Sequence, residues 1–197
     1  MKTFFTFVKY TGLIIIVLTL SIGGGFLFKY KSERKTQLEI MKNFETRRAE
    51  YLSYGNNSYS GSSKNFKSYL PGETVAILSL DRLDIKVSIK EGIDKQVLKL
   101  SAGHFPETAL PGKGNFCIAG HSSFVYTCIF NDMHKAVLGD IIEVETLNSS
   151  HTYEITEIMT VDPEQVEVLD PSSESLLTIV TCTNNGNNRL IIRGTEI

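Results

Sequence analysis

The chain has 197 residues, 42% of them hydrophobic and 21% charged, which allows one globular domain with appended segments. Its net charge of −2 is unevenly split: residues 1–54 carry nine Lys/Arg against four Asp/Glu, and residues 55–197 carry eleven against eighteen. The acidic second part argues against a nucleic-acid partner, whereas the basic first part suits the surface of a membrane with anionic lipid.

The first predicted element is a transmembrane helix. Nineteen uncharged residues, 10–28, lie between Lys9 and Lys29. As a helix rising about 1.5 Å per residue they span close to 30 Å, the thickness of a hydrocarbon core. No Ala-x-Ala site follows, although the small residues Ser21 to Gly25 keep a cleaved signal peptide open as an alternative. We therefore predict an uncleaved anchor within residues 1–30, although the flanking basic residues do not by themselves place the N-terminus in the cytoplasm.

Residues 31–69 are predicted to form a juxtamembrane helix followed by a linker. Large apolar residues recur at rough helical spacing as far as Gly55, namely Leu38, Met41, Phe44 and Leu52. Residues 53–68 are rich in Ser, Asn, Gly and Tyr, which is typical of a flexible linker. The helix can act as a spacer, as a lid over the active site or as a surface-lying helix, and the pattern favours a spacer.

Residues 70–197 have the pattern of a β protein. The predicted strands are Val75–Leu80, Leu83–Ile89, Ile141–Glu145 and Thr152–Thr160, and the predicted short helices are Asp94–Leu100 and Asn131–Val137. The last two strands flank a turn at Asn148, Ser149 and Ser150, which indicates a hairpin. Many short strands with few helices predict an all-β fold, either a closed barrel or a sandwich.

Three further apolar runs each carry a chemically distinctive residue at one end. Residues 114–121 end in His121, residues 178–182 end in Cys182, and residues 189–194 begin at Arg189. If the runs are neighbouring strands, a thiol, an imidazole and a guanidinium meet at one place, a combination that suits acyl transfer through a thioester. All four histidines precede Cys182, which excludes the papain-like order of cysteine before histidine.

The remaining candidates have simpler interpretations. The spacing of Cys117, Cys128 and Cys182 matches no zinc motif, so Cys182 is the candidate reagent and the others are small hydrophobes, with a Cys117–Cys128 disulfide left open. Arg193 competes with Arg189, because residues four apart on a strand share a face. Among the other histidines, His104 is interpreted as structural or substrate-adjacent in a turn, and His134 and His151 as surface residues.

These motifs resemble those of the sortases, the membrane-anchored cysteine transpeptidases of Gram-positive bacteria. The similarity covers about Leu70 to Ile197. The family's Thr-Leu-x-Thr-Cys motif stands here as Thr178-Ile179-Val180-Thr181-Cys182, its Ala-Gly-His strand end as Ile118-Ala119-Gly120-His121, and its arginine at the start of the last strand as Arg189. The resemblance implies an eight-stranded closed β-barrel for residues 70–197.

The resemblance also implies the site. Cys182 would be the nucleophile, His121 the general base and acid, and Arg189 the partner of the oxyanion, with Thr181, Arg189 and Ala119 contacting substrate. The substrate would be a surface protein with a C-terminal Leu-Pro-x-Thr-Gly (LPXTG)-like signal, cut between Thr and Gly. The acceptor would be an amine of a cell-wall precursor or a pilin lysine. The catalytic domain would lie outside a membrane crossed once, with the N-terminus in the cytoplasm.

No cofactor is expected. The stretch before the histidine strand, residues 105–114, has one acid, too few oxygen ligands for calcium, although acids at Asp162, Glu164 and Glu167 keep a contribution from the later loop open. A housekeeping or class D/E-like sortase is favoured, and a pilin-polymerising sortase without a lid stays open. A peptidase that only hydrolyses and a non-enzymatic barrel that binds a wall polymer or peptide are the alternatives.

Overall fold

The computed structural model describes residues 2–55, 69–122, 129–183 and 186–197, and the chain divides into two compact units, Met1–Thr36 and Gln37–Ile197. The first unit is the beginning of helix α1 (Lys2–Gly55), which is helical throughout the predicted anchor. No helix in the described part of the chain combines enough length with enough apolar character to span a bilayer. The transmembrane anchor in residues 1–30 therefore stays a prediction, as does the boundary at residue 69.

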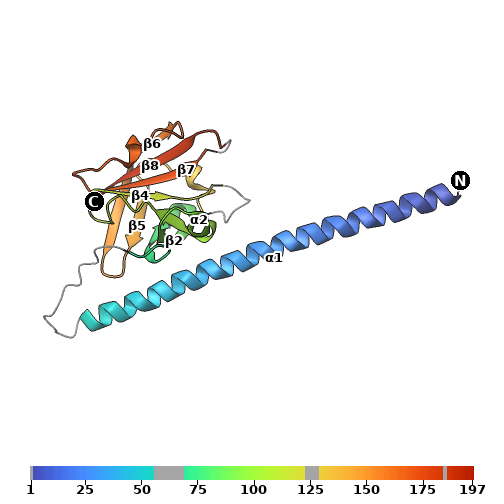
Figure 1. Cartoon of the computed structure of the whole chain (residues 1–197), viewed down its shortest axis with the longest axis horizontal. Helices are drawn as coiled ribbons and strands as arrows, with labels where there is room; N and C mark the ends of the chain where they lie inside the picture. The colour runs from blue at the N-terminus through green and yellow to red at the C-terminus, as the bar shows by residue number, and fades with distance from the viewer. Residues whose placement is uncertain (1, 56–68, 123–128, 184–185) are drawn as a thin grey trace. The chain divides into compact units, whose positions relative to one another are not determined.

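The second unit is built around a closed barrel in which the described residues form eight strands, in the order β1-β2-β3-β4-β7-β8-β6-β5 (Figure 1). The strands are β1 (Thr74–Leu80), β2 (Ile85–Glu91), β3 (Ala102–His104), β4 (Asn115–Ala119), β5 (Ile141–Glu145), β6 (Ser150–Val161), β7 (Leu176–Cys182) and β8 (Arg189–Glu196). Neighbours are antiparallel except for the pairs β2–β3 and β4–β7, which are parallel. The predicted eight-stranded closed β-barrel is confirmed.

Apolar side chains facing inward fill the barrel. The strand β5 alternates exposed and buried residues, with Ile142 and Val144 fully buried, as expected of a strand with one face toward the core. The largest buried side chains include Phe116, Phe130 and Tyr153, none of which has measurable exposure. In β5 the alternation of apolar and acidic residues therefore identifies the residues that face the core.

The short helices differ in part from the prediction. Helix α2 (Lys95–Leu100) begins at Asp94, whose carboxylate accepts hydrogen bonds from the backbone N–H groups of Gln96 and Val97, so this predicted helix is confirmed. The helix predicted for residues 131–137 is only a 3₁₀ turn, η2 (Met133–Lys135). Two further 3₁₀ turns are η1 (Asp81–Leu83) and η3 (Glu167–Leu169).

Strand β3 was predicted as a turn, and that prediction is wrong. The strand has three residues and pairs parallel with β2 after the short crossover through α2. Gly103 at its centre allows a close approach, because a Cβ there would lie 2.3 Å from the carbonyl oxygen of Gly92. The glycine that looked like a turn signal is needed for backbone packing within the barrel.

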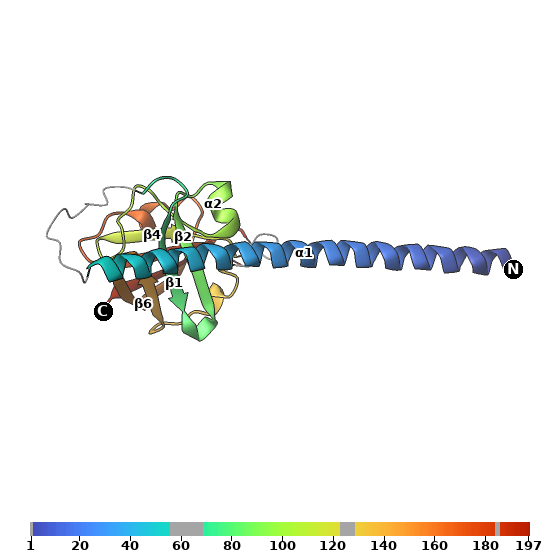
Figure 2. The ribbon, with the colours of Figure 1, turned by 90° about the horizontal axis from the view of Figure 1, so that it is seen from below.

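The part of α1 in the second unit, residues 37–53, packs on the outside of the barrel, and we call it the docked segment (Figure 2). Its Phe44 is 2% exposed and lies in a cluster with Ile77 of β1 and Leu147, with Met41 packed against them. Gln37 donates a hydrogen bond to the carbonyl of Leu100 over 3.1 Å. The sequence favoured a helix that acts as a spacer, whereas these residues contact the barrel.

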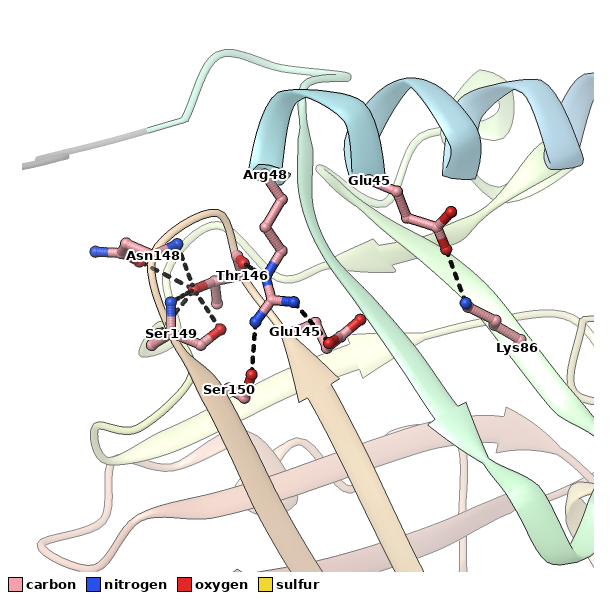
Figure 3. A network of polar contacts seen from close by, with 8 residues as sticks. All are labelled: Glu45, Arg48, Lys86, Glu145, Thr146, Asn148, Ser149 and Ser150. Atoms are coloured by element: carbon pink, nitrogen blue, oxygen red, sulfur yellow. Dashed lines mark hydrogen bonds and ion pairs between the residues drawn. The ribbon is translucent and has the colours of Figure 1, made fainter. Parts of the chain in front are cut away.

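Arg48 joins the docked segment to the β5–β6 turn (Figure 3). Its guanidinium donates to the carbonyl of Thr146 at 2.8 Å, to Glu145 at 2.7 Å and to the hydroxyl of Ser150 at 2.6 Å. The hydroxyl of Thr146 contacts Ser149 within the same turn at 2.7 Å. An exposed ion pair from Lys86 of β2 to Glu45, at 2.8 Å, adds little because water screens it.

The Arg48 end of the docked segment lies far from the end of β7. In the ring of strands β1 is four steps from β7 in either direction. Along β6, the Ser150 end contacts Arg48, whereas the Val161 end pairs with Arg189. Those ends are eleven residues apart, or roughly 36 Å at 3.3 Å per residue. The contacts of Arg48 therefore lie away from Cys182, at the opposite end of β6.

Candidate functional site

Cys182 and Arg189 lie opposite each other at the end of the β7–β8 hairpin where the two strands are connected. Strands β7 and β8 lie side by side in the barrel (Figure 1). They are antiparallel, and their register pairs Thr178 with Arg193 at one point and Cys182 with Arg189 at the last. Directly opposed residues on antiparallel strands have Cβ atoms about 4.5–5.5 Å apart. The thiol and the guanidinium stem therefore start from adjacent backbone positions.

His121 reaches the same place from the other side of β7. Strand β4 runs parallel to β7 with Ala119 opposite Val180, and two further steps bring His121 level with Cys182. The pairing continues past the end of β4, since the Gly120 N–H donates to the Val180 carbonyl at 3.2 Å. Three adjacent strands thus bring a histidine, a cysteine and an arginine to one end of the barrel.

Gly120 is required by the packing beneath the histidine. A Cβ at this position would lie 2.4 and 2.5 Å from ring atoms of Phe130, which is fully buried. The N–H of Phe130 also donates to the carbonyl of His121 at 3.1 Å. The Gly-His pair in the sequence therefore reflects close packing on Phe130 as well as chemistry.

The site combines a histidine that favours its neutral form with a cysteine that is partly exposed. Burial lowers the pKa of His121, which favours the neutral imidazole that can accept a proton at neutral pH. Cys182 is a free thiol with partial exposure. Cys117 is also free but fully buried, and burial raises the pKa of its thiol to about 11. Cys128 lies outside the described residues, and so does the disulfide that it was considered for.

The two arginines of β8 have different surroundings. Arg193 forms an ion pair with Glu157 at 2.8 Å and donates to the hydroxyl of Thr178 at 3.4 Å. Its charge is therefore neutralised along the wall of the barrel. Arg189 lies opposite Cys182, and its guanidinium donates a 3.4 Å hydrogen bond to the carbonyl of Asn188. The geometry favours Arg189 over Arg193 for a role beside the thiol.

The residues predicted to contact substrate lie at the same end of the barrel. Ala119 is partly exposed. Thr181 is 3% exposed, and its hydroxyl donates to the carbonyl of Gly120 at 2.8 Å. The hydroxyl of Thr181 is therefore occupied within the protein, and any contact with substrate would come from its backbone.

The other histidines have structural surroundings. His104 is 2% exposed, with Nδ1 at 2.7 Å from a carboxylate oxygen of the buried Glu91, so its structural interpretation fits. His151 was predicted at the surface, but its side chain is only 16% exposed and lies 2.7 Å from Glu196. His134 is exposed, as predicted. Across the described ranges, no three His, Cys, Asp or Glu side chains gather in a way that would hold a metal ion.

Ser122 was missed by the sequence reasoning. Its hydroxyl donates to the carbonyl of Cys182 at 2.8 Å, across the gap between the histidine and cysteine strands. A serine after the motif histidine carries no periodicity or spacing signal, so the sequence alone offered no means of finding it.

A thiol, a neutral imidazole and a guanidinium on adjoining strands of a closed barrel form a candidate site for nucleophilic acyl transfer. Comparison with known families agrees with this class. The family model described as the Sortase domain matches residues 78–197, more than half of the chain. The chain belongs to the sortase family, whose members are transpeptidases.

Individual relatives extend the match over most of the chain. Sortase A of Streptococcus agalactiae is 26% identical over 211 residues, covering 96% of this chain and 84% of that protein. Sortase D of Bacillus subtilis is 25% identical over 199 residues, covering 96% and 98%. Among solved structures, a Sortase D5 transpeptidase of Clostridium perfringens superposes with a TM-score of 0.65 at 32% identity, covering 84% of this chain and 98% of that one.

Proposed function

We propose that this sortase cleaves an LPXTG-like sorting signal between Thr and Gly and transfers the released protein to an amine acceptor of the cell wall. The observation that supports the proposal most is the register of β4, β7 and β8, in which Cys182 lies opposite Arg189 with His121 level on the other side. Acyl transfer needs a nucleophile, a base and a positive charge for the oxyanion within reach of one carbonyl.

The proposed chemistry proceeds through a thioester. The Cys182 sulfur attacks the threonine carbonyl while His121 accepts the thiol proton, and the guanidinium of Arg189 stabilises the negative oxygen of the tetrahedral intermediate. The C–N bond then breaks as His121 gives its proton to the glycine nitrogen. The acceptor amine attacks the thioester, loses its proton to His121 and releases the thiol, so that one amide replaces another.

The proposed location is the outer face of a cell membrane. Residues 1–30 would anchor the chain with the N-terminus in the cytoplasm, and the basic residues that follow directly, Lys29, Lys31, Arg34 and Lys35, would lie near anionic lipid. Similarity to a solved Sortase D5 structure at 32% identity over 84% of this chain supports a class D-like enzyme. The amine acceptor, either a cell-wall precursor or a pilin lysine, is decided by the experiment below.

The test uses the full-length chain and a panel of fluorogenic LPXTG-type peptides, with and without amine acceptors, followed by mass spectrometry. We expect a thioester on Cys182 and an amine-ligated product, both absent in Cys182→Ala. Cys117→Ala is the matched control, because it removes a buried thiol and should leave the product unchanged. Free acid as the sole product with every amine would support a hydrolytic peptidase, and no adduct from a folded protein would support a binding module.

A further inference from the structure

Ser122 and Thr181 make two side-chain hydrogen bonds between the His121 and Cys182 strands. Thr181 donates to the carbonyl of Gly120, the residue before His121, at 2.8 Å. Ser122, the residue after His121, donates to the carbonyl of Cys182 at 2.8 Å. The backbone of His121 is therefore held against β7 on both sides, at a level where β4 itself has already ended at Ala119.

The two bonds differ in how replaceable they are. The Thr181 bond lies next to a backbone bond, from the Gly120 N–H to the Val180 carbonyl, so the strand end stays paired there without it. After His121, the Ser122 hydroxyl joins this stretch to β7, and the N–H of Phe130 holds the His121 carbonyl from another direction. The Ser122 hydroxyl thus ties the backbone leaving His121 directly to the carbonyl of Cys182.

We propose that Ser122 is a positioning residue, whose bond to the Cys182 carbonyl holds His121 at the distance and angle needed to exchange a proton with the thiol. This inference rests on the proposed function and adds a residue to it. Small misplacements of a base cost rate steeply, since a shift of about 1 Å can lower a rate about 100-fold. Because the contacts at Gly120 and Phe130 remain, we expect Ser122→Ala to lower kcat about tenfold with little change in KM.

The decisive measurement follows the alkylation of Cys182 by iodoacetamide, from about pH 5 to about pH 9, by mass spectrometry of the Cys182 peptide from the full-length chain. This readout needs no knowledge of the sorting signal. The described groups that shape it are His121 and Arg189, which lie on the two sides of Cys182. Cys117 should remain unmodified in the folded chain because it is buried.

Three variants remove a group (His121→Ala, Ser122→Ala and Ser122→Val), and two controls keep the hydroxyl or lie elsewhere (Ser122→Thr and Ser173→Ala). His121→Ala should change the pH profile of alkylation, Ser122→Ala should move the profile toward that of His121→Ala, and Ser122→Thr should keep the wild-type profile because it retains the hydroxyl. Ser122→Val, which has the shape of threonine without the hydroxyl, should behave as Ser122→Ala. Ser173→Ala, an exposed serine on the loop before β7, should leave the profile unchanged.

A wild-type profile in Ser122→Ala, with a changed profile in His121→Ala, would overturn the positioning role and leave the proposed function intact. Equal profiles for the Thr and Val variants would overturn it as well, and this pair decides the matter if the alanine variant does not fold. A wild-type profile in His121→Ala would show that alkylation does not report on the histidine; kcat of Ser122→Val against Ser122→Thr then decides, and equal values would overturn the positioning role. An amine-ligated product that persists in both His121→Ala and Cys182→Ala would refute the proposed function itself.

Discussion

Replacing Phe44 with alanine should release the docked segment from the barrel. The ring of Phe44 is 2% exposed and packs on Ile77 and Leu147, and it is the buried aromatic residue of this small cluster. Phe-to-Ala changes at buried sites cost about 3–5 kcal/mol. The cluster lies on the outside of the barrel, so the site can relax by undocking, and we expect the low end of this range, about 3 kcal/mol.

Hydrogen exchange measured by mass spectrometry on the full-length chain tests this directly. A loss of about 3 kcal/mol lowers the protection of amides in residues 37–53 by about 150-fold, because each 1.4 kcal/mol is a factor of ten. Leu38→Ala is the matched control on the same helix, since Leu38 is 56% exposed and its loss should change protection little. Equal protection in the two variants would show that Phe44 does not hold the segment in place and would refute the reasoning.

Three further predictions concern stability. His104→Ala leaves the buried carboxylate of Glu91 without its partner, so chemical unfolding should show a loss of about 3–5 kcal/mol, and His104→Gln a smaller one. Arg48→Ala removes three hydrogen bonds to the β5–β6 turn and should cost about 1–3 kcal/mol in the same assay. Because burial lowers the pKa of His121, the unfolded chain binds more protons below about pH 6.5, so stability should fall as the pH drops from there through the folded pKa. His121→Gln should make that decline shallower in denaturant titrations at a series of pH values.

The long strands were predictable because their pattern is local. Alternating or continuous apolar runs bounded by turn residues predicted β1, β2, β5 and β6 to within a few residues. Strand β3 was not predictable in this way, because it has three residues, one of them Gly103, and its pairing with β2 depends on a crossover. A run of that length carries no periodicity that could outweigh the glycine.

For the docked segment, the apolar spacing predicted the helix but not its contacts with the barrel. The spacing of Leu38, Met41, Phe44 and Leu52 correctly predicted a helix that ends near Gly55. Only Phe44 among these four is buried, however, while Leu38 and Leu52 are 56% and 46% exposed. The pattern thus predicts the helix but not which barrel strand it contacts, because that depends on the outward face of β1.

Local sequence patterns predicted one part of the candidate site and not the rest. Cys182 and Arg189 are seven residues apart on consecutive strands, so a hairpin is enough to bring them together, and the sequence predicted this pairing. His121 lies 61 residues before Cys182 and reaches it only because β4 and β7 pair in parallel, which the family resemblance implied and local patterns did not. The hydroxyl of Ser122 could not be foreseen, because its partner is a backbone carbonyl on another strand.

Closure of the barrel explains how one small domain supports both the site and the docked segment. The ring order puts β7, which ends in Cys182, four strands from β1, which carries the Ile77 contact to Phe44. A closed sheet has no free edge, so each strand is paired with two neighbours. Loss of a contact on the outer face of β1 therefore leaves the pairing of β7 with β4 and β8 in place. Residues without shared partners at such separations contribute nearly independently to stability. The docked segment can therefore be weakened at Phe44 while the geometry of His121, Cys182 and Arg189 is retained, which makes its attachment and the chemistry of the site separable properties of this fold.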